Sequence, residues 1–391
     1  MNIYERALDL REQTVTDRRW FHQNAEIGLE MPAGKAYVMQ KLREYGLSPR
    51  ECGAGVTAEL GSGGKTLLLR ADMDALPMAE ESGLDFACTD GKAHACGHDF
   101  HAAMLLTAAK LLKEREGELQ GTVRFMFQPA EETFEGAADM IRHGILEPKP
   151  HAAMALHVTA GKMPTAMAFY NDTSTAMMFS GDGFELTIHG RGAHGAYPHQ
   201  SIDPINIGAH IHLALQTLIA RECDPNQAAV LTVGQFIAGS APNIIPETAV
   251  LRGTIRSNNS KERELLTRRL REVSEGTAAL FGGSVELRWI SKVPPLICDP
   301  DVVSAMTGYF RELPIPDLQV LPGAKGSASE DFALISEQIP SAFVYLSAGF
   351  TDERGEAVAH NPKVQFNEDA LPMGAAALTH CALRWLEEHN S

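Results

Sequence analysis

Apolar residues recur along the chain in two patterns, and together these predict alternating helices and buried strands. A spacing of three to four residues predicts helices over 3–23, 33–45, 99–114, 300–313, 331–337 and 368–388. Continuous apolar runs suit strands buried on both faces; they cover 65–72, 151–157 and 341–346, with another starting at 122. Residues 56–60 are expected to form a further short strand. This order predicts an α/β domain.

The pattern changes near residue 180. Residues 183–292 read as strand, helix, strand, strand, helix and strand, which is the ferredoxin-like order. Pro294 and Pro295 close this segment, and elements of the first kind resume after it. We therefore expect an α/β domain formed by 1–181 and 294–391, interrupted by an inserted domain over 182–293.

Composition narrows the possible partners and location. The chain of 391 residues carries 34 Lys and Arg against 50 Asp and Glu, a net charge of −16. Nucleic acids and anionic membranes are therefore not expected as partners, since both bind basic surfaces. No apolar run is long enough to span a membrane, and the first residues are charged. With six scattered cysteines, these features predict a reduced, cytoplasmic protein.

Ionisable residues directly follow three of the buried runs. Asp72 and Asp74 end the run that starts at 65. The adjacent pair Glu131 and Glu132 follows the run that starts at 122, and His157 ends the next one. Each has an ordinary structural reading: a turn, a helix N-terminus, or a core histidine. Three successive strands with such endings favour a site, because strand ends of open α/β sheets carry sites.

The segment HACGHD (94–99) adds donors of another kind. Cys96 and His98 are one residue apart, and a thiolate and an imidazole so placed can both ligate a zinc-like ion. Taken alone, a buried free cysteine beside hydrogen-bonded histidines explains the segment equally well. Asp99 is expected to cap the helix that follows.

The second half of the chain contributes further polar loops. His194 lies in the glycine-rich loop GAHGAYPH, and His360 lies in a loop after the last apolar strand. The segment GSASEDF (326–332) precedes a helix and can equally be a plain helix cap.

The candidate ligands are too many for one tetrahedral ion. They suit two ions about 3.5–4 Å apart, with one carboxylate left over to transfer protons. This set points to hydrolysis of an amide. The candidates are Cys96, His98, Glu131, Glu132, His157 and His360, with Asp72 and Asp74 behind them.

At this point the sequence resembles a known family. It is similar to the metallo-amidohydrolases of the aminoacylase and glutamate carboxypeptidase type, in the hippurate hydrolase (N-acyl-L-amino acid amidohydrolase) branch. The resemblance runs from about residue 15 to the C-terminal helix. Its landmarks are LRADMDALP (69–77), HACGHD (94–99), FQPAEE (127–132), GAHGAYPH (192–199), PNIIPETA (242–249), GTIR (253–256), SEDF (329–332) and HNPKV (360–364).

The resemblance implies roles for the metal-site residues. Cys96 would bridge two ions, and the other ligands would be His98, Glu132, His157 and His360. Glu131 would be the general base. Asp74 would orient a ligand imidazole. Asp72 stands where the wider family has a ligating histidine; the branch compensates with His98, so Asp72 is not assigned as a ligand.

The resemblance also implies roles for the insertion. The catalytic domain would be zinc-peptidase-like, and the insertion would be a lid and dimerisation domain, giving a homodimer or a higher assembly. His194 would stabilise the oxyanion, often in the partner's site. Asn243 and Arg256 would bind the substrate carboxylate, which suits a guanidinium. The cofactors would be two divalent ions per subunit, zinc first, with manganese, cobalt or nickel able to replace it.

The expected function is hydrolysis of N-acyl-L-amino acids, with N-acetyl, N-benzoyl or related groups, by a metal-bridged hydroxide and a glutamate base. A dipeptidase or carboxypeptidase acting on small peptides is the alternative within the same chemistry. A metal-free hydrolase with Cys96 as nucleophile leaves Glu131, Glu132, His157 and His360 unexplained. A non-catalytic zinc protein would have no need of the spare Glu131.

Overall fold

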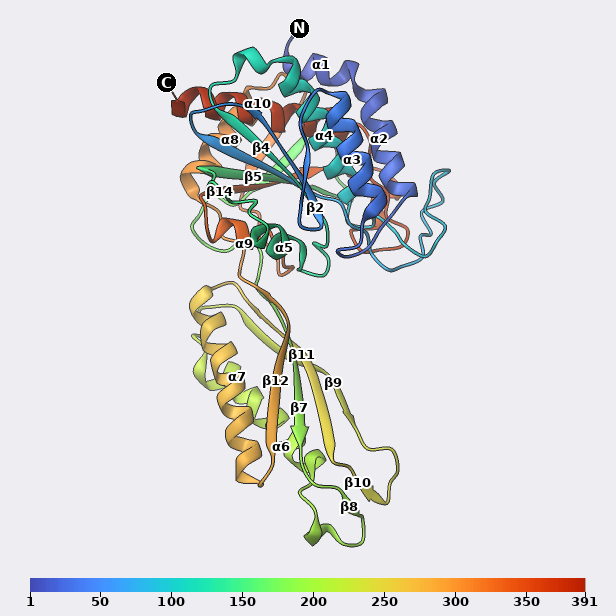
Figure 1. The fold of residues 1–391 in the computed structure, drawn as a ribbon, viewed down its shortest axis with the longest axis vertical. Helices are drawn as coiled ribbons and strands as arrows, with labels where there is room; N and C mark the ends of the chain where they lie inside the picture. The colour runs from blue at the N-terminus through green and yellow to red at the C-terminus, as the bar shows by residue number, and fades with distance from the viewer. Residues whose placement is uncertain (391) are drawn as a thin grey trace. The chain divides into compact units, whose positions relative to one another are not determined.

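The computed structural model describes residues 1–390, which fold into two compact units (Figure 1). Unit 1 comprises Met1–Ser174, Ile297–Ala324 and Leu334–Ser391. Unit 2 comprises Thr175–Leu296 and Lys325–Ala333. The expected insertion, 182–293, lies within the main segment of unit 2. The structure also assigns the later segment Lys325–Ala333 to this unit, which the sequence pattern did not indicate.

Unit 1 is built on an eight-stranded mixed sheet in the order β1-β2-β4-β3-β5-β14-β6-β13. Its four central strands, β4, β3, β5 and β14, are parallel, as expected for apolar runs buried on both faces. The strands are β1 (Arg50–Cys52), β2 (Gly55–Gly61), β3 (Thr66–Asp72), β4 (Thr122–Gln128), β5 (Ala152–Thr159), β6 (Met167–Tyr170), β13 (Gln319–Pro322) and β14 (Ser341–Ser347).

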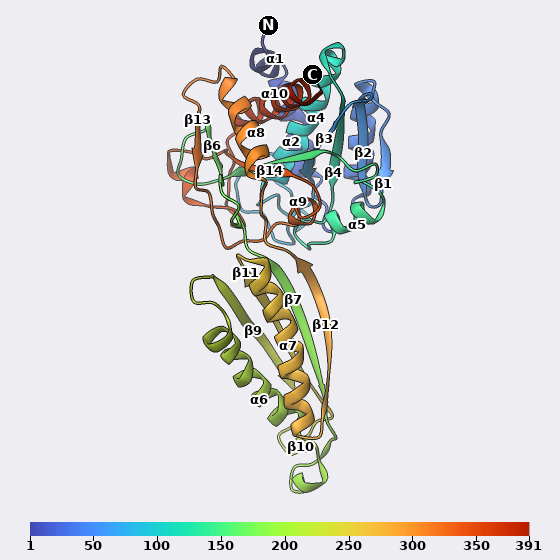
Figure 2. The same cartoon turned by 90° about the vertical axis from the view of Figure 1, so that its left-hand side faces the viewer.

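Helices α4 and α10 pack against each other and against the sheet, and α2 covers α4 (Figures 1 and 2). Among the described residues, no helix combines the length and apolar character needed to cross a membrane. The helices of this unit are α1 (Ile3–Asp9), α2 (Arg11–Gln23), α3 (Pro32–Glu44), α4 (His98–Glu114), α5 (Gly136–Arg142), α8 (Pro300–Glu312) and α10 (Ala370–Asn390), with α9 (Ala333–Ser336) starting at the unit boundary.

The structure corrects three local expectations. The single helix expected over 3–23 is broken at Leu10, which lets α1 pack on α10 and α2 pack on α4. Asp99 is not a helix cap: α4 begins at His98 with Gly97 in the cap position. The short strands β6 and β13 were not predicted, since each has only four residues.

Unit 2 is an antiparallel sheet in the order β12-β7-β11-β9 with two helices, α6 and α7. Its elements follow in the expected order: β7 (Gly181–His189), α6 (Pro204–Thr217), β9 (Ala229–Ala238), β11 (Thr248–Ser257), α7 (Ser260–Leu280) and β12 (Ser284–Val293). A small ribbon of β8 (Ala193–His194) and β10 (Ile244–Ile245) is added at one end.

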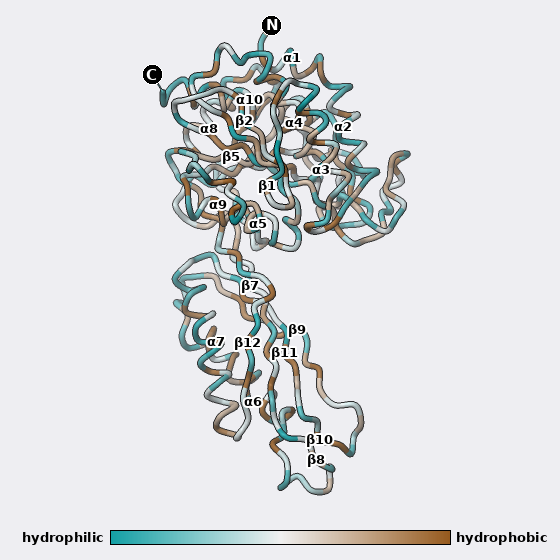
Figure 3. Tube along the Cα trace, viewed as in Figure 1, coloured by the Kyte–Doolittle hydropathy of each residue, from teal (hydrophilic) through white to brown (hydrophobic). Residues whose placement is uncertain are grey.

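One face of the unit 2 sheet is covered by the two helices. Phe184, Leu186 and Ile188 of β7 are fully buried and pack in one apolar cluster with Leu266 and Leu270 of α7. Exposed and half-buried residues alternate along β12, as expected for a strand with one open face. Figure 3 colours the chain by the hydropathy of each residue. The two units confirm the predicted fold class, an α/β domain with an inserted ferredoxin-like domain.

Candidate metal centre and active site

The candidate ligands of unit 1 gather where the central strands end. Strands β4, β3 and β5 are parallel neighbours, and Asp72 at the end of β3 lies opposite Gln128 at the end of β4. The segments that follow β3 and β4 therefore leave the sheet at one edge, which His157 of β5 and the start of α4 also reach. This is the edge at which open α/β sheets carry sites.

A glycine turn places Cys96 and His98 side by side. Gly97 between them has φ +88°, a left-handed conformation that side chains rarely adopt. A Cβ atom on Gly97 would also lie 2.5 Å from Cγ2 of Val158. The turn thus requires glycine both for its backbone angle and for the close approach of β5.

Asp74 holds two of the candidate ligands. His98 Nδ1 donates to Asp74, with its backbone oxygen at 2.9 Å and Oδ1 at 3.2 Å. The other carboxylate oxygen accepts the backbone N–H of Glu132 at 3.0 Å. His98 Nε2 is left buried without a hydrogen-bond partner, an arrangement that suits a metal-binding nitrogen.

His157 presents its ring in the same way. Its Nδ1 donates to the backbone oxygen of Val158 at 2.6 Å, so the lone pair lies on Nε2. That Nε2 lies 3.6 Å from Sγ of Cys96. Both imidazoles therefore turn Nε2 toward the same region.

His360 comes from a distant loop and completes the group. Its backbone N–H donates to the oxygen of Ala95 at 2.8 Å, and its own φ is +65°. Its Nε2 lies 3.3 Å from Oε1 of Glu132. The loop is thus tied to the residue preceding Cys96, which brings the last predicted ligand to the centre.

Two sets of three donors share the sulfur of Cys96. Within each set the donor atoms lie within 4.8 Å of one another: one set is Cys96, His98 and His157, and the other is Cys96, Glu132 and His360. Sulfur, imidazole nitrogen and carboxylate oxygen are the usual donors for zinc and related ions. With the unpartnered His98 Nε2, these residues fit a pair of divalent ions.

Negative groups in the site raise the pKa values of two of its histidines. The pKa of His360 is raised to about 10, mainly by its hydrogen bond to Cys96 and to a smaller extent by its hydrogen bond to Glu132. Burial would lower the pKa of His98, but the charges of Asp72 and Cys96 outweigh burial and raise it. Protons on His98 and His360 thus balance the charge of the neighbouring acidic groups. Divalent ions that bind to these imidazoles would displace the protons.

Glu131 and Asp72 lie at the centre outside these two sets, although each forms another set of three donors with His98: Glu131 with Glu132, and Asp72 with His101. Glu131 is 6% exposed, and its Oε2 lies 4.0 Å from His98 Nε2. The residue before it, Ala130, has φ +53°, so a left-handed turn aims the acidic pair. Asp72 already pairs with Arg70 through Oδ2 (2.7 Å) and with His101 through Oδ1 (2.5 Å), which leaves it poorly placed to ligate.

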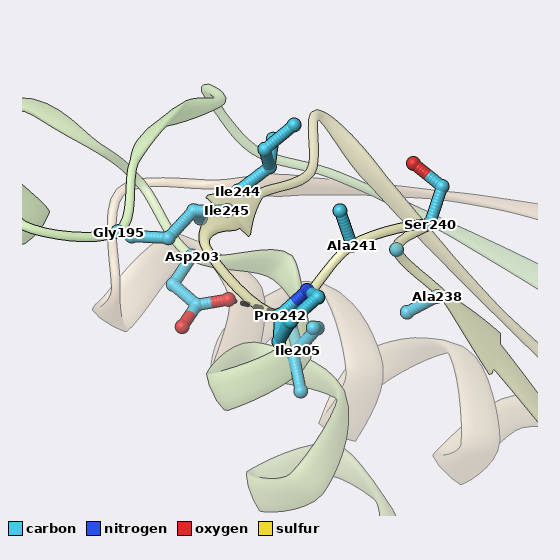
Figure 4. Close-up of a pocket in the computed structure, with 10 residues that line it drawn as sticks. Gly195, Asp203, Ile205, Ala238, Ser240, Ala241, Pro242, Ile244 and Ile245 are labelled. Carbon is cyan, nitrogen blue, oxygen red and sulfur yellow. Dashed lines mark hydrogen bonds between the residues drawn. The ribbon is translucent and has the colours of Figure 1, made fainter.

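The other predicted site residues belong to unit 2. His194 is exposed on β8, and its Nδ1 accepts the N–H of Ala196 at 3.1 Å, so the neutral ring carries its proton on Nε2. Asn243 is exposed, and its backbone oxygen accepts the N–H of Gly195 at 2.8 Å. A pocket of about 480 Å³ lies beside this ribbon (Figure 4), lined by Gly195, Asp203, Ile205, Ala238, Gly239, Ser240, Ala241, Pro242, Ile244 and Ile245.

Arg256 of β11 is held by Ser329 of the SEDF segment, a contact that the sequence pattern did not predict. Its Nη1 donates to Oγ of Ser329, which in turn donates to the backbone oxygen of Ser180 at 2.8 Å. Burial lowers the pKa of the Arg256 guanidinium. His101 was missed as well. Its signal is a third histidine three residues after His98.

Comparison with known proteins places the chain in a family. Residues 68–384 match Peptidase family M20/M25/M40. The chain is 37% identical over 387 residues to N-acetyl-L-cysteine deacetylase of Bacillus subtilis, covering 97% of this chain and 90% of that protein. It is 34% identical to IAA-amino acid hydrolase ILR1-like 4 of Arabidopsis thaliana, covering 97% and 87%.

A solved structure agrees with this placement. A dinuclear metal-binding peptidase of the M20 family from Bacillus subtilis superimposes with a TM-score of 0.79 at 30% identity, covering 97% of this chain and 99% of that one. The family resemblance expected from the motifs is thereby confirmed. The chain belongs to peptidase family M20/M25/M40, as a metal-dependent amidohydrolase.

Proposed function

We propose that the protein hydrolyses the amide bond of N-acyl-L-amino acids carrying N-acetyl, N-benzoyl or related groups, releasing a carboxylic acid and a free amino acid. One observation carries this proposal: two donor sets share Cys96, and Glu131 lies beside them outside both sets. The names of the similar deacetylase and amino acid hydrolase support the substrate class.

The donor set suits two divalent ions, and we propose zinc, with manganese, cobalt or nickel as possible replacements. When bound, such ions polarise a carbonyl and lower the pKa of a water molecule to about 7. Glu131 is proposed to take a proton from the attacking water. It then returns this proton to the amine nitrogen as the C–N bond breaks.

The residues of unit 2 are proposed to bind the rest of the substrate. Arg256 offers a half-buried guanidinium, whose fork geometry suits the carboxylate of the amino acid. Asn243 offers an exposed amide in the same proposed role. His194 carries its proton on Nε2, so it can donate to the carbonyl oxygen as negative charge develops there.

Amine release from a panel of substrates tests the proposal. The panel contains N-acetyl, N-benzoyl and long-chain N-acyl amino acids together with dipeptides, and metal content is measured on the same protein. Turnover of the N-acyl compounds with about two ions per chain is expected. Turnover of dipeptides alone would replace the proposal with the dipeptidase alternative, and a protein that binds no metal would refute both.

The role of Glu131 is tested by Glu131→Gln. This variant is expected to keep its metal and to lose activity by roughly 10² to 10⁴-fold, the usual size of a general acid–base contribution. Glu135→Gln is the matched control, because Glu135 is exposed four residues away on the same segment. A Glu131→Gln enzyme with near wild-type rate would show that another group is the base.

We also propose that the protein forms a homodimer through unit 2. Within residues 1–390, strand β9 is the edge of its sheet and pairs only with β11. Its ten residues, AVLTVGQFIA, include no charge, and Val230, Phe236 and Ile237 are 45%, 43% and 53% exposed. Long uncharged edges aggregate unless something covers them, and a second copy of β9 would pair with this one. Ile237→Lys is expected to yield monomers in light-scattering measurements.

Mixed dimers test whether His194 serves the site of the partner subunit. His194→Ala and Glu131→Gln subunits should each be nearly inactive alone. A mixed dimer would carry one site with both groups intact, so recovered activity supports sharing, provided a tagged pull-down first verifies subunit exchange. Verified mixed dimers without recovered activity would place His194 in its own subunit's site or outside the chemistry.

A further inference from the structure

His101 lies next to the candidate ligand His157 and has no role in the mechanism proposed above. It belongs to the first turns of α4, and it is 1% exposed. Its ring centroid lies 4.4 Å from that of His157. A fully buried imidazole in contact with a metal-binding candidate must have both ring nitrogens matched to partners, because an unmatched buried polar atom is destabilising.

The partners of His101 determine where its proton lies. The backbone N–H of Val158 donates to Nε2 at 2.8 Å, so this nitrogen must carry a lone pair. The proton of the neutral ring therefore lies on Nδ1, and it is donated to Oδ1 of Asp72 at 2.5 Å. His101 thus acts as an acceptor toward β5 and as a donor toward β3.

The contact with Val158 replaces a missing strand partner. The pairing of β3 with β5 ends at Arg70 and Ala155, three residues before Val158. Beyond that point the N–H of Val158 has no partner on β3, and the His101 ring supplies one. On the side of β3, the end of β5 is therefore held by a side chain of α4, whereas on its other side it still pairs with β14 up to Thr159.

Asp72 anchors the other side of the ring. Its Oδ2 accepts from Arg70 Nη1 at 2.7 Å, and Arg70 Nε donates to Oε1 of Gln128 at 2.9 Å. The chain of contacts from Val158 through His101, Asp72 and Arg70 to Gln128 therefore joins β5, α4, β3 and β4. All of these residues are buried.

We propose that His101 is a positioning residue that sets the place of the His157 imidazole and thereby the affinity for the ion held by Cys96, His98 and His157. His157 precedes Val158 in the chain, and its Nδ1 donates to the backbone oxygen of Val158. Fixing the N–H of Val158 therefore fixes both the backbone and the ring orientation of His157. This inference rests on the proposed two-ion site.

Three variants separate the two contacts of the ring. His101→Gln can still accept from Val158 N–H, because its amide oxygen reaches the place of Nε2. His101→Asn keeps only a donor toward Asp72, near the place of Nδ1. His101→Phe keeps neither contact. His380→Phe is the matched control, since His380 lies on α10 and pairs with Glu312 at the surface.

Zinc titration against a chelating dye measures each ion separately. For His101→Phe we expect one of two ions to bind roughly 10- to 100-fold more weakly, the size typical of lost support to a metal ligand. The second ion should bind as in the wild type. His101→Gln should recover most of the lost affinity, and His101→Asn should not.

Several results would overturn the inference. Two ions bound by His101→Phe with wild-type affinity would show that the ring does not act on the site. Better recovery by Asn than by Gln would show that the Val158 contact is not the one that matters. If His101→Phe does not fold, the Gln and Asn variants alone give the comparison. A wild-type protein that binds fewer than two ions would instead refute the proposed function.

Discussion

Replacing Asp99 by leucine would leave the guanidinium of Arg18 buried without its nearest counter-charge. Arg18 Nε lies 2.7 Å from Oδ2 of Asp99, and the two side chains are 1% and 0% exposed. Solvent water cannot stabilise the remaining charge at such depth, so the protein itself must compensate it. The pair joins α2 to the first turn of α4, immediately after His98.

The structure allows the size of the effect to be worked out. Removing one partner of a buried ion pair costs roughly 3–5 kcal/mol. Glu368 Oε1 remains 3.2 Å from Arg18 Nη1, and the Phe100 ring remains 4.7 Å from the guanidinium carbon, so part of the compensation persists. The hydrogen bond from His22 Nδ1 to Asp99, at 2.8 Å, is lost as well. We expect Asp99→Leu to lower the free energy of unfolding by about 4 kcal/mol.

Denaturant unfolding of the metal-free protein measures this effect without a contribution from metal binding. Arg18→Met should lower the free energy of unfolding by a similar amount, because it leaves the Asp99 carboxylate buried without the counter-charge of Arg18. The double variant should lose less than the sum of the two, with a coupling of about 2 kcal/mol or more. Arg268→Gln is the control: its pair with Glu272 is 55% and 43% exposed and should change stability by less than about 0.5 kcal/mol.

Two results would refute this reasoning. A loss below about 1 kcal/mol for Asp99→Leu would show that the remaining partners compensate Arg18 fully. Strictly additive losses in the double variant would show that the two residues stabilise the fold independently, and that the cost lies elsewhere in the site.

Three further predictions concern the same region. Cys96→Ala should reduce bound metal as well as rate, because the sulfur belongs to both donor sets; full metal content with no activity would favour a thiol nucleophile. Gly97→Ala should destabilise the protein by about 1–3 kcal/mol in denaturant unfolding, because of its positive φ and the 2.5 Å approach to Val158; unchanged stability would contradict this. Burial would lower the pKa of His22, but hydrogen bonds to Asp99 and Glu80 raise it. The charged form therefore stabilises the fold below about pH 6.5, and the stability advantage of wild type over His22→Gln should shrink as pH rises through the raised pKa.

The linear sequence determined the elements and the chemistry of the donors. Helices and buried strands follow from the spacing of apolar residues, because burial of one face or both dictates that spacing. The fold class, the family and the enzyme class were predicted correctly because the motifs around Cys96, Glu131 and His360 are short and contiguous. The roles of these residues and the limits of the inserted domain stay predictions.

Tertiary structure decided what the side chains can do once they are together. The sequence placed Asp72 and Asp74 in one motif. Only the fold shows that Arg70 and His101 occupy the oxygens of Asp72, whereas Asp74 supports His98 and Glu132. These partners come from different strands and helices. Which carboxylate is free to bind a metal and which one holds a neighbouring side chain therefore depends on hydrogen bonds to distant segments. No local sequence pattern encodes these hydrogen bonds.

The same reason explains the elements that were missed or misassigned. Strand β13 is four residues long and pairs with β6, about 150 residues earlier in the chain, so its own sequence has too few positions to show a period. Aspartate is a common residue at helix caps, yet the Asp99 side chain pairs with Arg18 inside the protein. An unpaired buried guanidinium would cost more free energy than an uncapped helix end. Such choices are made by long-range pairing of charges and strands, which exists only in the folded chain.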